Sequence, residues 1–261
     1  MIDTHIHSYF SADSETDPQS YIIKAIDMGL KVLTFTDHYD LDYHEGMCMH
    51  FQLESYFNEL IKLKEAYKDK IKILIGIEVG MQSHISEKIK NSIKDYPFDY
   101  IIGSTHLIRG QDPYFRKLFP KGTSKEDALN EYFDTMYSNL NSYSFFDSMG
   151  HIDYLKRYTE FDDNGIYYNE YKEKIDLILK HLIENEKALE LNTSGIDEYP
   201  FDFKIIKRFK ELGGKYITLG SDSHNQNQLC RHFDFCIEQI KLCGFDYITY
   251  YENRQPIKIK V

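Results

Sequence analysis

The sequence has few cysteines for its 261 residues, and they are not arranged as oxidised or zinc-binding proteins arrange them. Cys48, Cys230, Cys236 and Cys243 include no CxxC pair, and three of them lie in one C-terminal stretch. This distribution is typical of reduced cysteines in a protein core. Cys236 and Cys243 are spaced to share a helix face, so we expect buried thiols there, with metal ligation as the lesser alternative.

Long apolar segments and positive charge are also scarce. No segment approaches the ~18 apolar residues of a membrane span, and the first residues lack the basic and apolar regions of a secretion signal. We therefore expect a cytoplasmic protein. Lysine and arginine total 31 against 42 acidic residues, a formal net charge of -11. That charge disfavours nucleic acid and acidic membranes as partners and favours a small or cationic ligand, and it leaves the oligomeric state open.

Nothing in the sequence marks a domain boundary. It has no Ser/Pro/Gly-rich linker, no low-complexity tract and no repeat of constant period. A chain of this length buries enough surface to form a core without disulfides or oligomerisation. We therefore predict a single domain over residues 1–261.

Short β-branched apolar runs alternate with longer amphipathic segments, which is the pattern of β/α units around a parallel sheet. The predicted strands are 1–7, 31–38, 70–80, 98–106, 144–153, 188–195 and 215–224. The predicted helices are 18–28, 53–69, 85–94, 125–142, 167–185, 203–212 and 228–242, and two short runs follow at 247–251 and 257–261. Seven such units predict an α/β fold that is nearly a complete barrel, with an open doubly wound sheet as the alternative.

Histidine and acidic side chains stand at the C-terminal ends of these predicted strands. They are His5, His7, His38, Glu78, His106, His151, Asp222 and His224. In a β/α barrel the C-terminal ends of all strands meet at one mouth, where active sites lie. The predicted order of strands and helices therefore places all eight side chains at the mouth of the barrel.

The spacing and the chemistry of these residues indicate a metal site. His5 and His7, like Asp222 and His224, are two residues apart, so each pair points to one face of a strand. A lone strand histidine is usually a packed or hydrogen-bonded residue, but buried carboxylates such as Glu78 need cationic partners. Imidazole nitrogen combined with carboxylate oxygen suits Zn, Mn or Fe, and the donors suffice for more than one ion.

These residues lie in a series of short motifs that resembles a known family. The motifs are Asp3-Thr-His5-Ile-His7-Ser, Thr36-Asp37-His38, Gly76-Ile-Glu78, Gly103-Ser-Thr-His106, Gly150-His151-Ile-Asp153 and Gly220-Ser-Asp222-Ser-His224. In this order they resemble the polymerase-and-histidinol-phosphatase (PHP) superfamily. The words Tyr154-Leu-Lys-Arg-Tyr158 and Asn192-Thr-Ser-Gly195 look most like its histidinol-phosphatase branch.

The resemblance implies a distorted seven-stranded barrel with a trinuclear metal site. The first ion would be held by His5, His7, Glu78 and Asp222, and the second by Glu78, His106 and His151. The third would be held by His38, His224 and the residue eight positions after His5. Some members have histidine at that position and this chain has Asp13, which also suits turn capping. Two or three divalent transition-metal ions are therefore expected.

Residues around the predicted ligands suggest supporting roles. Asp37 and Asp153 adjoin ligating histidines and are predicted to accept hydrogen bonds that set their tautomers. Arg157 is the first choice to clamp a substrate phosphate and Arg116, in the Gly/Pro-containing segment after His106, is the second. For each arginine the alternative is a surface charge.

Ions that share Glu78 and a water molecule would generate hydroxide for in-line attack on a phosphomonoester. This role, together with a proton for the leaving group from Asp222, His224 or water, makes Glu78, Asp222 and His224 the predicted catalytic residues. The resemblance implies L-histidinol phosphate as substrate, cleaved to L-histidinol and phosphate in histidine biosynthesis. Asp40, Asp42 and Glu45 beside the mouth are candidates to receive its ammonium group, although a solvated charge run is the commoner reading.

Three other functions are compatible with parts of this pattern. A phosphatase of the same superfamily acting on phosphotyrosine or nucleotides needs the same metals and arginine. A nuclease is disfavoured because the chain has no basic stripe. A noncatalytic metal-binding protein is disfavoured because the ligand set is complete.

Overall fold

A computed structural model describes residues 1–44 and 46–261 of the chain. Its centre is a parallel sheet made of β1 (Ile2–Asp3), β2 (Val32–Phe35), β3 (His38–Tyr39), β4 (Lys72–Gly80), β5 (Tyr100–Ser104), β6 (Ser148–Met149), β7 (Ala188–Asn192) and β8 (Ile217–Gly220). The strand order is β1-β2-β4-β5-β6-β7-β8, and β3 pairs with β4 beyond the end of β2. All pairs within this sheet are parallel.

The sheet curls until its first and last strands meet. The backbone N–H of Thr4 donates to Leu219 O at 3.3 Å, and the N–H of His7 donates to Ser223 O at 2.8 Å. Ile6 forms a parallel bridge with Ser223 between these two bonds. The predicted seven-unit barrel is therefore confirmed, and the open sheet is excluded.

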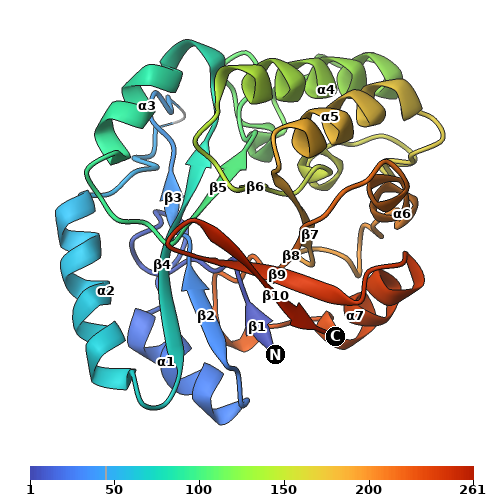
Figure 1. Cartoon of the computed structure of the whole chain (residues 1–261). Coiled ribbons are helices and arrows are strands. Elements are labelled where there is room, and N and C mark those ends of the chain that lie inside the picture. Colours follow the sequence, from blue (N-terminus) through green and yellow to red (C-terminus); the bar gives the residue numbers. More distant parts are fainter. Residues whose placement is uncertain (45) are drawn as a thin grey trace.

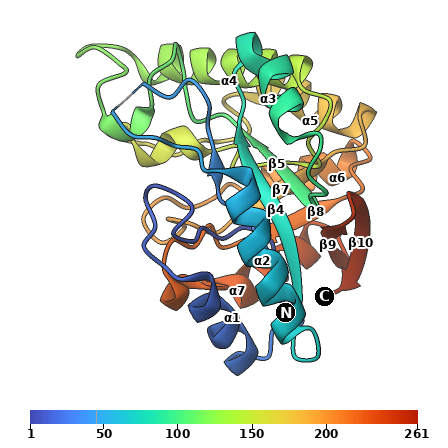
Figure 2. The same ribbon diagram turned by 90° about the vertical axis from the view of Figure 1, so that its left-hand side faces the viewer.

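Helices surround the barrel (Figures 1 and 2). They are α1 (Pro18–Asp27), α2 (Leu53–Tyr67), α3 (Ser86–Ile93), α4 (Lys125–Ser142), α5 (Lys172–Glu184), α6 (Lys204–Glu211) and α7 (Phe233–Leu242). Short 3-10 helices occur at Ser83–Ile85, Pro113–Phe115, Tyr154–Arg157 and Gln226–Gln228. Within the described residues, no helix combines the length and the apolar character that crossing a membrane requires.

Helix ends follow local chemistry that the sequence displays. At α1, the Asp17 side chain accepts a hydrogen bond from Gln19 N at 2.7 Å, and Pro18 occupies the first turn. Gly29 follows this helix with a φ of 72°, a conformation that glycine adopts without a steric penalty. At α4, the Ser124 hydroxyl accepts from Asp127 N at 3.0 Å. These capped helices have the starts that the sequence predicts.

Elements without such signals differ from the prediction. α5 begins at Lys172, not at residue 167, and residues 228–232 do not belong to α7. The strands are shorter than predicted, because the chain leaves the sheet near its motif residues to turn them into the mouth. The predicted strand 31–38 is divided into β2 and β3 at Thr36 and Asp37, whose side chains are hydrogen-bonded to the loop that carries His7.

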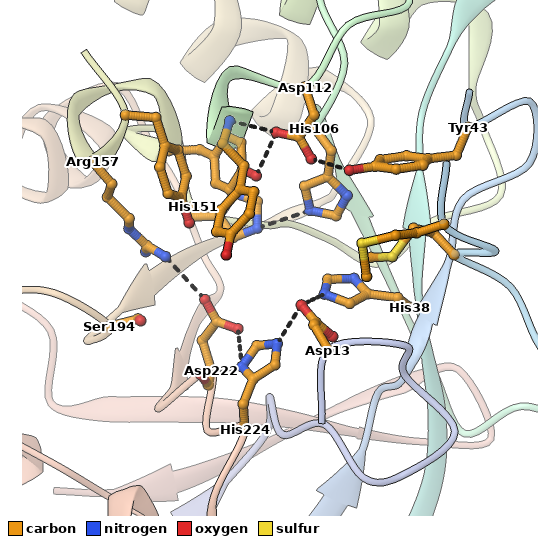
Figure 3. Close-up of a pocket in the computed structure, with 15 residues that line it drawn as sticks. Asp13, His38, Tyr43, His106, Asp112, His151, Arg157, Ser194, Asp222 and His224 are labelled. Atoms are coloured by element: carbon orange, nitrogen blue, oxygen red, sulfur yellow. Dashed lines mark hydrogen bonds and ion pairs between the residues drawn. The ribbon is translucent and has the colours of Figure 1, made fainter. Parts of the chain in front are cut away.

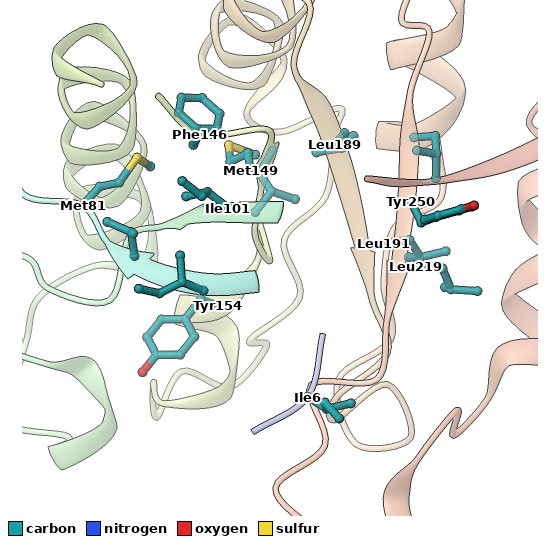
Figure 4. Close-up of a cluster of buried hydrophobic side chains, with 14 of the residues drawn as sticks. Ile6, Met81, Ile101, Phe146, Met149, Tyr154, Leu189, Leu191, Leu219 and Tyr250 are labelled. Atoms are coloured by element: carbon teal, nitrogen blue, oxygen red, sulfur yellow. The ribbon is translucent and has the colours of Figure 1, made fainter. Parts of the chain in front are cut away.

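The apolar core fills the barrel and the space between barrel and helices. Figure 4 shows Met81, Ile101, Phe146 and Met149 packed together, with Leu189, Leu191 and Leu219 on neighbouring strands. Such burial is the main favourable contribution to folding. It makes the strands a rigid frame for whatever their ends carry.

A β-hairpin closes one end of this frame. β9 (Tyr247–Glu252) and β10 (Gln255–Lys260) are antiparallel and cross the barrel in the view of Figure 1. Tyr251 stacks on Tyr100 with ring centroids 5.2 Å apart, and Arg254 N donates to Asp99 O at 2.9 Å. Because Asp99 and Tyr100 stand where β5 starts, the hairpin covers the N-terminal ends of the strands. The opposite, C-terminal ends are left for a site.

Candidate metal centre

The first group of predicted ligands comes together where the barrel closes. His5 and His7 follow β1, Glu78 lies in β4, and Asp222 follows β8. His5 Nε2 lies 3.0 Å from His7 Nε2 and 3.4 Å from Glu78 Oε1, and Asp222 Oδ1 lies 3.2 Å from His7 Nε2. Asp3 links the segment that carries His5 to the segment that carries Asp222, since its Oδ1 accepts hydrogen bonds from His5 N and from Ser221 N.

The second group shares Glu78 with the first. His106, just after β5, and His151, just after β6, both turn their Nε2 atoms toward Glu78 Oε1, at 3.3 and 2.9 Å. The two Nε2 atoms are 3.4 Å from each other. Glu78 is fully buried, so its carboxylate stands between two clusters of imidazoles.

The third group lies nearer the solvent. His224 Nε2 and His38 Nε2 lie 3.2 and 3.5 Å from Asp13 Oδ2. His7 packs between these two histidines, with ring centroids 4.2 Å from His224 and 4.1 Å from His38. The Asp13 side chain is 39% exposed, whereas the side chains of the first group are at most 8% exposed. The structure thus brings together all nine predicted ligands, in one buried pair of groups and one rim group.

The spacing of the buried donors fits metal coordination. Nitrogen ligands lie about 2.0–2.1 Å from zinc, so tetrahedral ligand atoms stand about 3.3 Å apart. The separations within the two buried groups are 2.9–3.7 Å. Within the described part of the chain, the buried His151 Nδ1 has no hydrogen bond, and Glu78 Oε2 and His224 Nε2 have only ion-pair contacts, with histidines and with Asp13 respectively. Unsatisfied buried polar atoms and facing imidazole nitrogens are what divalent cations relieve, so the residues fit the implied ions.

The electrostatics give Glu78 and His7 the protonation states that metal binding requires. Burial opposes the charge of Glu78, but His106, His5 and His38 outweigh it and hold the pKa of this carboxyl well below its usual range. Burial, with His38 and His224 nearby, lowers the pKa of His7 well below the ordinary histidine value. An ionised carboxylate and a neutral imidazole are the forms that bind cations. Burial opposes the charge of His5, His38 and His106, but neighbouring carboxylates outweigh it and raise the pKa of these three histidines well above the ordinary value, so an ion must displace their protons.

Glu190 supports this centre, and sequence reasoning missed it. It lies in β7 and is fully buried. Its Oε1 lies 2.6 Å from His5 Nδ1, and its Oε2 accepts from His151 N at 2.9 Å. A carboxylate on the outer nitrogen of a ligating histidine directs the other nitrogen to the metal. The signal was present, because an acidic residue inside an apolar strand is the same pattern that singled out Glu78.

Asp40 has a similar supporting position. It is buried, and its Oδ1 lies 2.8 Å from His106 Nδ1. Gly80 makes room for it, since a Cβ atom there would stand 1.8 Å from Asp40 Oδ1. The interpretation of Asp40 as a receptor for substrate ammonium is therefore wrong. Asp42 does not line the pocket and pairs with Lys88 at 2.8 Å, and Glu45 lies outside the described residues.

Asp37 and Asp153 do not contact the imidazoles as predicted. Asp37 accepts hydrogen bonds from Ser8 and Ser11, and it is Ser11 Oγ that lies 3.1 Å from His7 Nδ1. Asp153 forms a buried ion pair with Lys156. Both carboxylates therefore hold the loops that carry ligands, and act on the histidines only through other residues.

The two predicted phosphate-binding arginines lie in different places. Arg157 lines a pocket of about 310 Å³ above the ligands, with Asp13, His38, His106, His151, Asp222 and His224 (Figure 3). It donates to Asp222 Oδ2 at 3.2 Å and to Asn192 Oδ1 at 2.9 Å, while its buried Nε has no hydrogen bond among the described residues. Arg116 is half exposed, lies 3.5 Å from Glu160 and lines a separate hollow.

Comparisons with known proteins agree with this geometry. The PHP domain family matches residues 3–194. The "Histidinol-phosphatase" of Lactococcus lactis is 39% identical over 85% of this chain and 84% of its own length. A Clostridium acetobutylicum protein named "Probable histidinol-phosphatase" is 35% identical over 97% of this chain and 98% of its own. The crystal structure of the Lactococcus lactis enzyme in complex with zinc, L-histidinol and phosphate superposes with a TM-score of 0.93 at 36% identity, covering 98% of both chains.

Proposed function

The chain belongs to the PHP domain family and is a histidinol-phosphatase, and from this premise we propose how its own residues hydrolyse L-histidinol phosphate to L-histidinol and phosphate. One observation carries the proposal. Histidines and carboxylates from the ends of β1, β3, β4, β5, β6 and β8 converge at a pocket of about 310 Å³, and its wall also contains Arg157, whose side chain is only 10% exposed. That combination suits a small phosphomonoester.

We propose the following holders for two or three divalent ions of zinc, manganese or iron. His5, His7, Glu78 and Asp222 hold the first, Glu78, His106 and His151 hold the second, and Asp13, His38 and His224 hold the third. When bound, such ions neutralise phosphate oxygens and lower the pKa of coordinated water. Glu190 and Asp40 keep the outer nitrogens of His5 and His106 occupied, so that the Nε2 atoms of both rings face the centre.

Arg157 is the proposed phosphate clamp. Asp222 and Asn192 each accept a hydrogen bond from one terminal nitrogen of its guanidinium, which leaves the second N–H of each of these nitrogens for a ligand oxygen. Its position is also set by Asp153 and Lys156, whose ion pair stabilises the 3-10 helix that carries it. Guanidinium groups bind phosphate with directed, charge-assisted hydrogen bonds. Arg116 would reach the phosphate only after a rearrangement, so we assign it no role in clamping.

Proton transfer to the leaving alkoxide is assigned to the rim of the pocket. Asp222 and His224 stand beside Arg157, and the side chain of His224 is 29% exposed, so it also contacts solvent. Burial opposes the charge of Asp222, but the cations around it, His5 first among them, outweigh burial and hold the pKa of this carboxyl well below its usual range. Water is therefore the proposed source of the proton, and Asp222 and His224 are proposed to orient that water. Glu78 is catalytic in a different sense, because it holds two groups of ligands in one geometry.

We also propose that residues 1–261 act as one catalytic domain in the cytoplasm. The proposed ligands span His5 to His224 in sequence, and the hairpin β9–β10 packs beneath the same barrel. The substrate is a charged phosphate ester, and the four cysteines are free thiols, including the exposed Cys48, which suits a reducing compartment.

The test is a comparison of substrates on protein with measured metal content. We expect kcat/KM for L-histidinol phosphate to exceed that for nucleotides and for a phosphotyrosine peptide by well over tenfold. A smaller preference, below roughly 1.4 kcal/mol of transition-state stabilisation, would mean that another phosphomonoester is the substrate.

A further inference from the structure

Asp112 is a carboxylate on the wall of the pocket that belongs to none of the three ligand groups. The chain reaches it by a tight turn after His106, in which Arg109 and Gly110 both have positive φ and Ile108 bridges Gln111. This turn brings Asp112 back over the mouth. The residue is 6% exposed, and the surface it keeps faces the pocket.

Among the described residues, only neutral groups donate hydrogen bonds to this carboxylate. Tyr43 donates its hydroxyl to Oδ2 at 2.8 Å, and Oδ1 accepts from the Tyr154 hydroxyl at 3.0 Å and from Tyr114 N at 2.9 Å. Within residues 1–44 and 46–261, no lysine, arginine or histidine forms an ion pair with it. A buried carboxylate is normally paired with a cation, because neutral dipoles compensate its charge only in part.

The cationic side chains nearby already interact with residues other than Asp112. Arg157 donates to Asp222 and Asn192, and His106 Nδ1 lies against Asp40. Asp112 is therefore left to attract a positive charge that enters the pocket from outside.

The walls next to Asp112 also suit a nitrogen cation. Tyr43, Tyr154, Met47 and Met49 line the same pocket and present aromatic rings and thioethers. Aromatic faces attract cations, and thioethers pack against flat rings. Figure 3 shows Asp112 across the pocket from Asp222 and His224, with Arg157 on the side of Asp222. The pocket thus has a phosphate-binding side and, opposite it, a lone negative charge.

We infer that Asp112 binds the positively charged nitrogen group of the substrate and thereby determines specificity among phosphomonoesters. The inference rests on the proposed function and adds the residue that recognises the L-histidinol part of the substrate. The carboxylate retains lone pairs beyond its three present hydrogen bonds, so a ligand N–H can join without displacing the tyrosines. The nitrogen group is either the ammonium or the imidazolium of L-histidinol phosphate.

A purely local role for Asp112 is the competing explanation, and Asp112→Asn separates the two. Asp112 caps the 3-10 helix Pro113–Phe115 through its bond from Tyr114 N. Asparagine caps equally well, keeps the shape and removes the charge. If capping is the only role, Asp112→Asn behaves as the wild type. Asp42→Asn is the matched control, because it removes a negative charge from an acid that lies outside the pocket.

The experiment measures kcat/KM of metal-loaded enzyme on two substrates and the affinity for L-histidinol by calorimetry. For Asp112→Asn we expect kcat/KM on L-histidinol phosphate to fall about 30- to 100-fold and L-histidinol to bind at least tenfold more weakly. On propyl phosphate, which has no cation, we expect a change below about twofold. Metal content and Tm should match the wild type, and Asp42→Asn should match it throughout.

The outcomes distinguish failure of this inference from failure of the proposed function. If the wild type does not prefer L-histidinol phosphate, the proposed function fails. If it does, and Asp112→Asn loses activity equally on both substrates or on neither, then Asp112 does not read the cation. Two analogues assign the group: leucinol phosphate keeps only the ammonium, and 3-(imidazol-4-yl)propyl phosphate keeps only the imidazole. The analogue on which Asp112→Asn loses activity carries the group that Asp112 binds, and loss on neither would overturn the inference.

Discussion

The two ends of the barrel are built from the same strands, but their buried carboxylates have different kinds of partner. At the base, the Asp99 and Asp147 carboxylates accept from the backbone N–H groups of Ile75 and Ile101 and also pair with Lys64 and Arg254. At the mouth, Glu78 faces only imidazoles and a serine hydroxyl. The carboxylates of the base are satisfied within the chain.

The two ends also differ in how many buried polar atoms lack a hydrogen bond. Of the eight buried side-chain atoms in the described residues that lack a hydrogen bond, six lie at the mouth, on His38, Asp40, Glu78, His151, Arg157 and His224. Leaving buried polar groups unsatisfied costs stability, so a fold tolerates it where a ligand completes the set. The base therefore stabilises the barrel, and the mouth is prepared for ions and substrate. Each prediction below tests this division.

Glu78→Gln should have the largest effect. The amide keeps the shape but removes the charge shared by two ligand groups, so we expect kcat to fall about 10³-fold or more, together with a loss of bound metal. Metal analysis and turnover on L-histidinol phosphate measure the two effects. In the wild type, added metal should raise the Tm, and in Glu78→Gln it should raise it less. Full metal content in the variant would show that Glu78 is not a shared ligand.

Arg157→Gln should come next and should leave the metals in place. Loss of the clamp should lower kcat/KM about 10²- to 10³-fold, since a directed charge-assisted contact to phosphate is removed. Arg116→Gln is the control at the neighbouring hollow, and we expect it to change kcat/KM less than about threefold. Equal losses in both variants would place the phosphate closer to Arg116 than the structure suggests.

Glu190→Gln should weaken metal binding without abolishing catalysis. Its amide NH₂ group cannot accept a hydrogen bond from His5 Nδ1, so the proton of His5 is driven to the Nε2 atom that faces the centre. We expect metal affinity to fall about 10- to 100-fold and kcat at saturating metal to stay within about tenfold of the wild type. Titration with metal under a competing chelator measures the affinity. An unchanged affinity would make Glu190 a structural residue only.

Arg254→Gln should affect the base alone. It leaves the buried Asp147 carboxylate without its cation, and because the Arg254 side chain is 32% exposed, we expect a loss of only about 1–2 kcal/mol in the free energy of unfolding. Kcat and metal content should not change. Lys72→Gln breaks the more exposed pair with Glu252 and should cost about 0–0.5 kcal/mol. A loss of metal in Arg254→Gln would show that base and mouth are coupled.

The sequence predicts which side chains meet at the mouth, because the signal of these residues is their position along the chain. His5, Glu78, His106 and Asp222 stand at the C-terminal ends of apolar runs, and the barrel brings those ends together whatever the details of the loops. The bounds of α1 are local in the same sense, since Asp17, Pro18 and Gly29 act through their immediate neighbours.

Residues whose role depends on distant partners could not be assigned in this way. From its place after His38, Asp40 is predicted to lie beside the mouth and to receive the substrate ammonium group. In the structure it is buried against His106, because Gly80 leaves room for it. Asp112 lies in the Gly/Pro-containing segment after His106, and only its packing against Tyr43 and Tyr154 in the wall of the pocket shows where it faces. Arg116 lies in the same segment, but its αL conformation directs it to Glu160.

What the sequence by itself determined is the barrel, its capped helices and the set of side chains that we propose as metal ligands, because periodicity, caps and strand ends are local properties of the chain. The tertiary structure alone decided which carboxylates meet at the proposed metal centre, which lie against the outer nitrogens of the histidines and which one faces the pocket. Those roles depend on contacts between distant segments, such as those of Asp3 and Ser221, which are 218 residues apart, and on the space that packing leaves around each acid.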